Sequence, residues 1–141
     1  MTPHINTRAA RYLRLGEAYI SAARGVLAAP DFEQVRLPFY GLLGHGMELA
    51  LKSVAARAGW DDERLMWLGH DLDWAWRVTL SDAGFEVPGA RAVGGVIRQL
   101  SRPHHAQAFR YPALLSWPLP DPRCALAAAE DYRDLVRDRD R

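Results

Sequence analysis

Cysteine is almost absent from this sequence, since Cys124 is the only one among 141 residues. A single thiol can form no disulfide and no thiolate metal cluster within one chain, which excludes a disulfide-stapled secreted domain. No stretch approaches the ~20 apolar residues that a membrane-spanning helix needs. Residues 1–8 are polar and resemble no secretion signal. We therefore expect a soluble, cytoplasmic protein without membrane contact.

An excess of either charge is also lacking. The 18 Lys and Arg residues nearly balance the 17 Asp and Glu residues, which gives a net charge of +1. Proteins that bind nucleic acid through their overall field are strongly basic, so that class is excluded and any nucleic-acid site must be local. The 141 residues, 49% of them hydrophobic, suit a single compact domain spanning 1–141.

Helical periodicity is what the sequence does contain. Apolar and small residues recur at alternating spacings of three and four over 5–28 and again over 39–54, which predicts two long helices. Shorter periodic segments predict a third helix from about 70 to 81 and a fourth over 87–100. No alternating strand pattern is present. The predicted fold class is all-α, an up-and-down bundle of four to five helices.

Prolines mark the far part of the chain. Four of them fall within 112–122, which predicts an extended connector between a helical core at about 5–112 and a last helix at about 122–138. The end of that helix alternates Arg and Asp, so it is expected to be solvated and frayed. Trp117, within the connector, is expected to pack against the bundle or a partner subunit.

A first polar motif lies on the second predicted helix. Glu48 precedes Lys52 by four residues, an order that favours an ion pair, and a plain surface ion pair would explain both residues. His45 shares their stripe, and His with Glu at this spacing occurs in helical metal sites. Because Lys52 would place a cation beside the metal, we predict no metal and no other cofactor. A metal-dependent enzyme built on His45 and Glu48 remains an alternative.

A second polar motif, His70 and Asp71, opens the third predicted helix, where helix capping alone would account for it. Glu48 to Lys52 followed by 70–72 (His-Asp-Leu) resembles, in content, order and separation, the core pattern of HEPN domains, the higher-eukaryote and prokaryote nucleotide-binding helical family. Residues 109–112 (Phe-Arg-Tyr-Pro) are similar to the Arg-Tyr-Pro that closes a long helix in one branch of that family. The resemblance covers about 12–112.

This resemblance implies an up-and-down helical bundle that commonly forms homodimers. Many members are metal-independent ribonucleases, or toxins built on them, with an Arg-x4-6-His motif at the dimer cleft. There a His moves the proton of the ribose 2′-hydroxyl and an Arg stabilises charge on the phosphate. The partners implied are RNA or a nucleotide, a second copy of the chain, and a cognate nucleotidyltransferase antitoxin. Other members lack the motif and act as nucleotide- or protein-binding adaptors.

Arg98, His104 and His105 are the candidates for this motif, because five residues separate Arg98 from His104 and six separate it from His105. On an unbroken helix Arg98 and His105 share a face and His104 points away, since seven residues make about two turns. Pro103 is expected to kink or restart the helix, and a restart would gather His104, His105 and Arg110 on one final turn. A partly exposed helix end without catalytic duty is the alternative.

Further residues could contact a bound nucleotide. Arg102 and Arg110 add positive charge suited to a phosphate, and Tyr111 could stack on a base or simply pack beside the connector. A crowded tryptophan cluster lies among several acidic residues, so it is expected to pack in the core or a dimer interface rather than on bases; it comprises Trp60, Trp67, Trp74 and Trp76. Two functions follow as hypotheses, a metal-independent ribonuclease of toxin or defence type and a non-catalytic nucleotide- or protein-binding adaptor.

Overall fold

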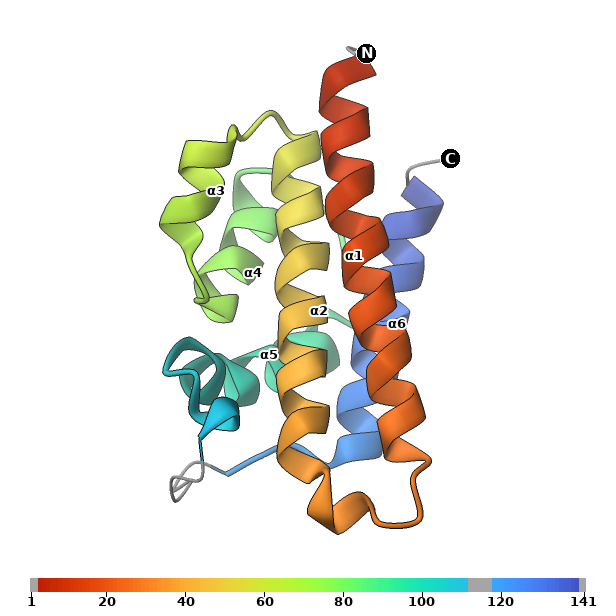
Figure 1. The fold of residues 1–141 in the computed structure, drawn as a ribbon. Coiled ribbons are helices and arrows are strands. Elements are labelled where there is room, and N and C mark those ends of the chain that lie inside the picture. The colour runs from red at the N-terminus through yellow and green to blue at the C-terminus, as the bar shows by residue number, and fades with distance from the viewer. Residues whose placement is uncertain (1–2, 112–117, 140–141) are drawn as a thin grey trace.

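The computed structural model describes residues 3–111 and 118–139 of the chain. In this part all regular structure is helical, with six α-helices and two short 3-10 turns. The helices surround one hydrophobic core, which confirms the predicted all-α bundle (Figure 1). No helix of the described residues combines the length and the apolar character that crossing a lipid bilayer requires.

Two long antiparallel helices, α1 (Pro3–Leu27) and α2 (Arg36–Arg57), run the length of the molecule (Figure 1). The turn η1 (Phe32–Gln34) lies between them. The helices approach closely where glycines face each other: a Cβ on Gly46 would lie 2.7 Å from Cγ1 of Ile20, and one on Gly16 would lie 3.0 Å from the Gly46 carbonyl oxygen. Only a residue without a side chain fits such a contact. Apolar residues occur all around α2, as is typical of a central helix.

Two short helices, α3 (Asp62–Leu68) and α4 (Leu72–Ser81), cover one side of α2 (Figure 1). Each begins at an aspartate N-cap: the Asp61 carboxylate accepts from the Arg64 N–H, and the Asp71 carboxylate accepts from the Trp74 N–H, both at 2.9 Å. The capping prediction for Asp71 is thus confirmed. The sequence pattern did not predict α3, so the bundle has one helix more than expected.

Helix α5 (Ala90–His105) continues through Pro103, so the predicted restart at this proline is wrong. Proline in the last turn removes only one hydrogen bond. Burial of Pro103 and His104, together with a 2.9 Å bond from the Ala106 N–H to the Arg102 carbonyl oxygen, keeps that turn helical. The turn η2 (Ala108–Arg110) follows, after Gln107 adopts a left-handed φ of 56°.

Helix α6 (Pro122–Arg139) runs antiparallel to α1 and returns the chain toward its N-terminal end (Figure 1). The expected fraying from residue 133 onward is wrong, because the helix persists to Arg139. Tyr132 and Val136 are buried on its inner face, and the Arg137 guanidinium pairs with Glu17 of α1 at 3.0 Å. Tertiary contacts therefore stabilise the last turns of α6, although their composition alone predicted a solvated tail.

The tryptophan cluster divides into two pairs. Trp60 and Trp76 are buried, which confirms the predicted core packing for these two. Trp67 and Trp74 are 64% and 40% exposed and lie on α3 and α4. Their packing in a dimer interface stays a prediction. Trp117 and Pro112 lie outside the described residues.

Candidate functional site

A buried carboxylate in the middle of α2 organises the first polar group of residues. Glu48 is 4% exposed, and its Oε1 accepts hydrogen bonds from His70 Nδ1 at 2.8 Å and His104 Nε2 at 2.9 Å. Its Oε2 accepts from Lys52 Nζ at 3.1 Å. We call Glu48, Lys52, His70 and His104 the inner cluster. A buried carboxylate is tolerated only with such partners, and here three donors supply them.

Electrostatics keep this carboxylate ionised. Burial acts to raise the pKa of Glu48, but the hydrogen bonds from His104 and His70 and the charge of Lys52 outweigh it and lower the pKa to about 2. Since Glu48 only accepts, both imidazoles donate N–H groups to the same oxygen. Glu48 and Lys52 form a buried pair, with side chains 5% and 12% exposed, so the simpler interpretation of a surface ion pair is wrong.

Three separate segments bring the inner cluster together. Glu48 and Lys52 come from α2, whereas His70 follows Gly69 in the link between α3 and α4, where Gly69 has a φ of +54°. His104 comes from the last turn of α5 and lies directly over Gly44, because a Cβ on Gly44 would be 2.7 Å from His104 Nδ1. Asp71 is not a member, since its carboxylate caps α4.

A cavity of about 370 Å³ opens beside the inner cluster. It is lined by Tyr19, Gly41, His45, His70, His104, Gln107, Phe109 and Arg110. The His45 ring meets Tyr19 edge-on at 4.5 Å, and burial lowers the pKa of His45. We call this space the histidine cavity. It offers a ligand aromatic walls, imidazole nitrogens and the half-exposed side of His70.

Helix α5 separates the candidates for the Arg–His motif. Arg98, Arg102 and His105 lie along its exposed stripe and line a second space of about 370 Å³ together with Ser101, Asp71 and Asp73. We call this space the outer groove. His104 is on the opposite, buried side. This is the arrangement expected for an unbroken helix, in which Arg98 and His105 share a face.

The basic side chains of the outer groove are not engaged within the described part of the chain. There, Arg98, Arg102 and His105 make no side-chain hydrogen bond or ion pair, whereas both carboxylates are engaged. Asp71 accepts from the Trp74 N–H, and Asp73 pairs with Arg77 at 3.5 Å. The guanidinium groups therefore remain open to an anionic ligand.

Arg110 and Tyr111 do not join the outer groove. Arg110 lies in η2, bonds Gln107 Oε1 at 2.7 Å and lines the histidine cavity. Tyr111 is 59% exposed and lines neither space. The predicted gathering of His104, His105 and Arg110 on one turn is wrong, because α5 does not restart at Pro103 and the left-handed Gln107 redirects the chain before η2.

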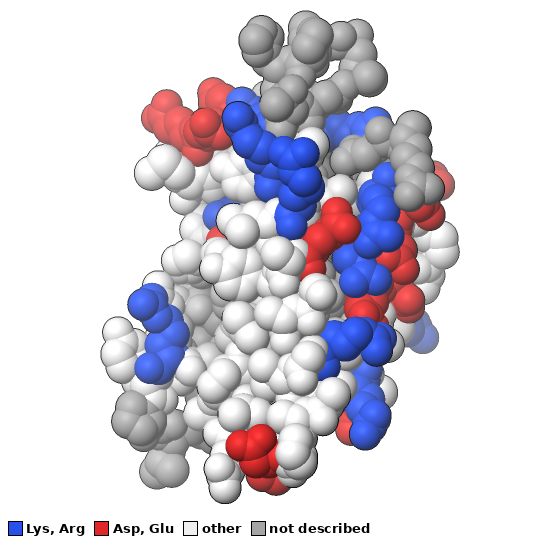
Figure 2. Space-filling model, turned by 45° about the vertical axis from the view of Figure 1, so that its right-hand side comes forward, with Lys and Arg blue, Asp and Glu red and all other residues white. Residues whose placement is uncertain are grey.

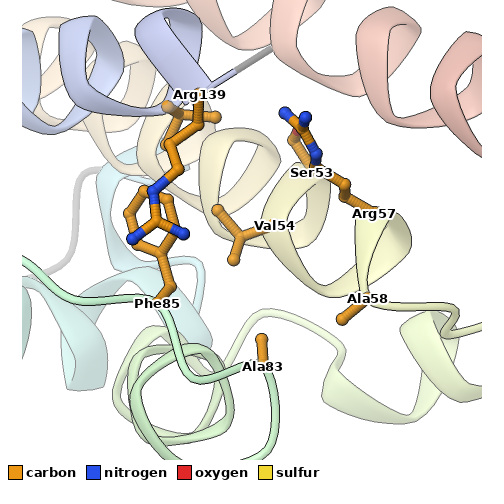
Figure 3. A pocket seen from close by; sticks show the side chains of 8 residues that line it. Ser53, Val54, Arg57, Ala58, Ala83, Phe85 and Arg139 are labelled. Atoms are coloured by element: carbon orange, nitrogen blue, oxygen red, sulfur yellow. The ribbon is translucent and has the colours of Figure 1, made fainter.

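A smaller cavity of about 250 Å³ lies at the other end of α2 and is lined by none of the predicted site residues (Figure 3). The Arg139 guanidinium stacks over the Phe85 ring at 4.6 Å on one side of the cavity, and Ser53 and Arg57 of α2 line the other side (Figure 3). Figure 2 shows basic and acidic side chains interspersed beside a wide uncharged area. On that face the described residues form no continuous basic surface, in keeping with the net charge of +1.

Comparisons with family models, with curated proteins and with solved structures find no match to this chain. The candidate functional residues thus lie in two places, the outer groove and the inner cluster. The outer groove combines guanidinium groups with an exposed imidazole, which suits a phosphate and a proton transfer. The inner cluster combines a carboxylate with two imidazoles at hydrogen-bonding distance.

Proposed function

We propose that this protein is a HEPN-like RNA- or nucleotide-binding protein that cleaves RNA without a metal at the outer groove, in the manner of a toxin or defence ribonuclease. The observation that carries the proposal is the shared face of Arg98, Arg102 and His105, three exposed side chains lining one space of about 370 Å³. This arrangement needs Arg98 and His105 seven positions apart on one continuous helix, and α5 provides it.

The chemistry assigned to these residues is general acid–base catalysis with charge stabilisation. The His105 imidazole takes the proton of the ribose 2′-hydroxyl, and the oxygen then attacks the adjacent phosphorus. A 2′,3′-cyclic phosphate forms, the bond from phosphorus to the 5′-oxygen breaks, and that oxygen receives a proton from His105 of a second copy. Arg98 and Arg102 stabilise the charge that develops on the phosphate oxygens.

A homodimer belongs to this proposal because each outer groove exposes a single imidazole, His105, whereas the cleavage step uses one imidazole to take a proton and another to give one. Two grooves facing each other would supply both imidazoles, together with Arg98 and Arg102 from each copy. Helix α4, which carries Asp73, and the preceding helix α3 also expose large apolar side chains, a typical mark of a contact surface. These are Met66, Trp67 and Trp74.

The test is RNA cleavage by the purified chain in EDTA, which removes any metal contribution. We expect His105→Ala and Arg98→Ala each to lower the cleavage rate by about 100-fold or more, since positioned proton transfer alone contributes 10²–10⁴-fold. The matched control is Arg123→Ala, which removes an exposed arginine from α6 and should leave the rate unchanged. Absence of cleavage, or cleavage that survives His105→Ala, would contradict the proposal.

A non-catalytic adaptor is the second candidate. Gln99 follows Arg98, where the HEPN motif usually has Asn, Asp or His, and two carboxylates line the groove. In this case a nucleotide raises the melting temperature of the wild type, because a ligand that binds only the folded state stabilises it, and Arg98→Ala removes the increase without any cleavage being seen. Co-purification with a nucleotidyltransferase antitoxin would fit either candidate.

A further inference from the structure

The inner cluster places three metal-ligating atoms in one small volume. Glu48, His70 and His104 each offer one ligand atom, and these three atoms all lie within 4.8 Å of one another. Glu48 and His104 are buried, and His70 is intermediate. The atoms come from α2, from the link before α4, and from α5, so tertiary packing rather than local sequence assembles them.

The donor set is one that transition metals prefer. Two imidazole nitrogens and one carboxylate oxygen are the protein ligands of many catalytic zinc sites and of two-histidine, one-carboxylate iron sites. Tetrahedral zinc with bonds of ~2.0–2.1 Å separates its ligand atoms by about 3.3 Å. The present separations from Glu48 Oε1 are 2.8 and 2.9 Å, as befits hydrogen bonds. Replacing the N–H protons by a metal therefore requires both imidazole nitrogens to move a few tenths of an ångström away from Glu48 Oε1, and it requires the two nitrogens, which lie within 4.8 Å of each other, to come to about 3.3 Å apart.

The surrounding residues already orient these ligands. Although Lys52 places a cation near this site, its charge is paired with the other carboxylate oxygen of Glu48 at 3.1 Å, which fixes the carboxylate and leaves Oε1 directed at the imidazoles. Gly44 leaves room for the His104 ring, whose Nδ1 would lie 2.7 Å from any Cβ at that position. The His70 side chain is 45% exposed, so it has more freedom than His104 to make the movement required.

The histidine cavity gives a metal both access and space for an additional ligand. His70 and His104 line this cavity of about 370 Å³, so a coordination position not used by the protein would face it. His45 lines it as well, which would place an imidazole near a water or substrate in that position. Sites that retain an open position are those in which a metal does chemistry rather than only holding the fold.

We propose that Glu48, His70 and His104 bind a divalent first-row transition metal, for which Zn²⁺ is the probe, with an open coordination position facing the histidine cavity. The sequence directed attention to His45 with Glu48 and predicted no metal. The histidines that contact Glu48 Oε1 are instead His70 and His104, 22 and 56 residues away. This proposal does not rest on the ribonuclease, whose groove works without a metal.

The experiment uses the full-length chain without an affinity tag. After metal removal by a chelator, the protein is titrated with Zn²⁺ against a chromogenic competitor, and bound metal is counted by elemental analysis after desalting. We expect one Zn²⁺ per chain and a higher melting temperature with Zn²⁺. His70→Ala should weaken Zn²⁺ binding by at least about tenfold, because at metal sites even the loss of a residue that only hydrogen-bonds a ligand costs about that much. His105→Ala is the matched control, since its ring faces the outer groove, and should bind as the wild type does.

Cobalt supplies a measurement that does not depend on a variant folding well. Co²⁺ in the wild type should give the intense visible absorption of a four-coordinate site, and Zn²⁺ should displace it. Wild-type protein that retains no Zn²⁺, equal binding by His70→Ala, or a Co²⁺ spectrum typical of fully hydrated metal would each overturn the proposal. Because RNA cleavage is tested in EDTA, failure of one proposal is distinguishable from failure of the other.

Discussion

The substitution Gly44→Ala tests the inner cluster with a single methyl group. The added Cβ would lie 2.7 Å from Nδ1 and 3.2 Å from Cγ of His104. Ordinary contacts are longer than this, so the ring must move. The ring cannot move away from α2 without lengthening the 2.9 Å bond from its Nε2 to Glu48 Oε1. The substitution therefore weakens a buried hydrogen bond between two other side chains, although Gly44 itself has no side chain.

The expected magnitude combines opposing effects. Loss of a hydrogen bond to a charged group destabilises by about 1.5–3 kcal/mol. Overpacking adds about 1 kcal/mol or more where the ring cannot relax fully. Alanine in place of glycine within a helix stabilises by about 1 kcal/mol. We expect Gly44→Ala to lower the free energy of unfolding by about 1.5–3 kcal/mol.

The assay is equilibrium unfolding in urea, with Gly95→Ala as the matched control. Gly95 lies within α5, and a Cβ added there meets nothing within 4 Å. That variant should gain the helical preference of alanine alone and become more stable by about 0.5–1 kcal/mol. If Gly44→Ala proved as stable as the wild type, or gained stability as Gly95→Ala does, the packing of His104 against α2 and its bond to Glu48 would be refuted.

Two further predictions concern the same central helix. Folding lowers the pKa of Glu48 from its ordinary 4.5 to about 2, so the metal-free protein should lose about 3 kcal/mol of stability as the pH falls from 4.5 to about 2. Glu48→Gln should abolish that part of the loss. If urea unfolding showed the same pH dependence of stability for Glu48→Gln as for the wild type, the prediction would be contradicted. Gly46→Ala should destabilise the protein by about 2 kcal/mol or more, because its Cβ would lie 2.7 Å from Ile20 Cγ1 and 3.1 Å from the rigid carbonyl oxygen of Gly16. A melting temperature equal to that of the wild type would refute the close approach of α1 and α2.

The fold was largely predictable because most helices carry their own signals. Periodicity marked 5–28 and 39–54, close to the observed α1 and α2. Helix α3 was missed because it has only seven residues, too few to show a period. A signal for it was nevertheless present: Asp61 is an N-cap, and the acidic Asp62 and Glu63 follow it in the first turn.

Of the candidate sites, the sequence could predict only the arrangement of residues that lie on a single helix. Arg98 and His105 lie on the same helix, so their shared face follows from spacing alone. The bond between His104 and Glu48 joins residues 56 apart, and no local pattern encodes such a contact. Pro103 added a misleading signal, because its effect on a helix depends on tertiary packing that the sequence does not display.

The neighbouring histidines His104 and His105 project about 100° apart from the last turn of α5, one buried beside Glu48 and the other exposed beside Arg98. Helix α5 thus has two edges that differ by one position in the sequence: an inner edge with His104 and an outer edge with Arg98, Arg102 and His105. We therefore expect replacements along the inner edge to change the stability of the chain and its metal binding, and replacements along the outer edge to change the binding of a phosphate. A double alanine variant of the pair would mix both effects, so each histidine has to be changed alone.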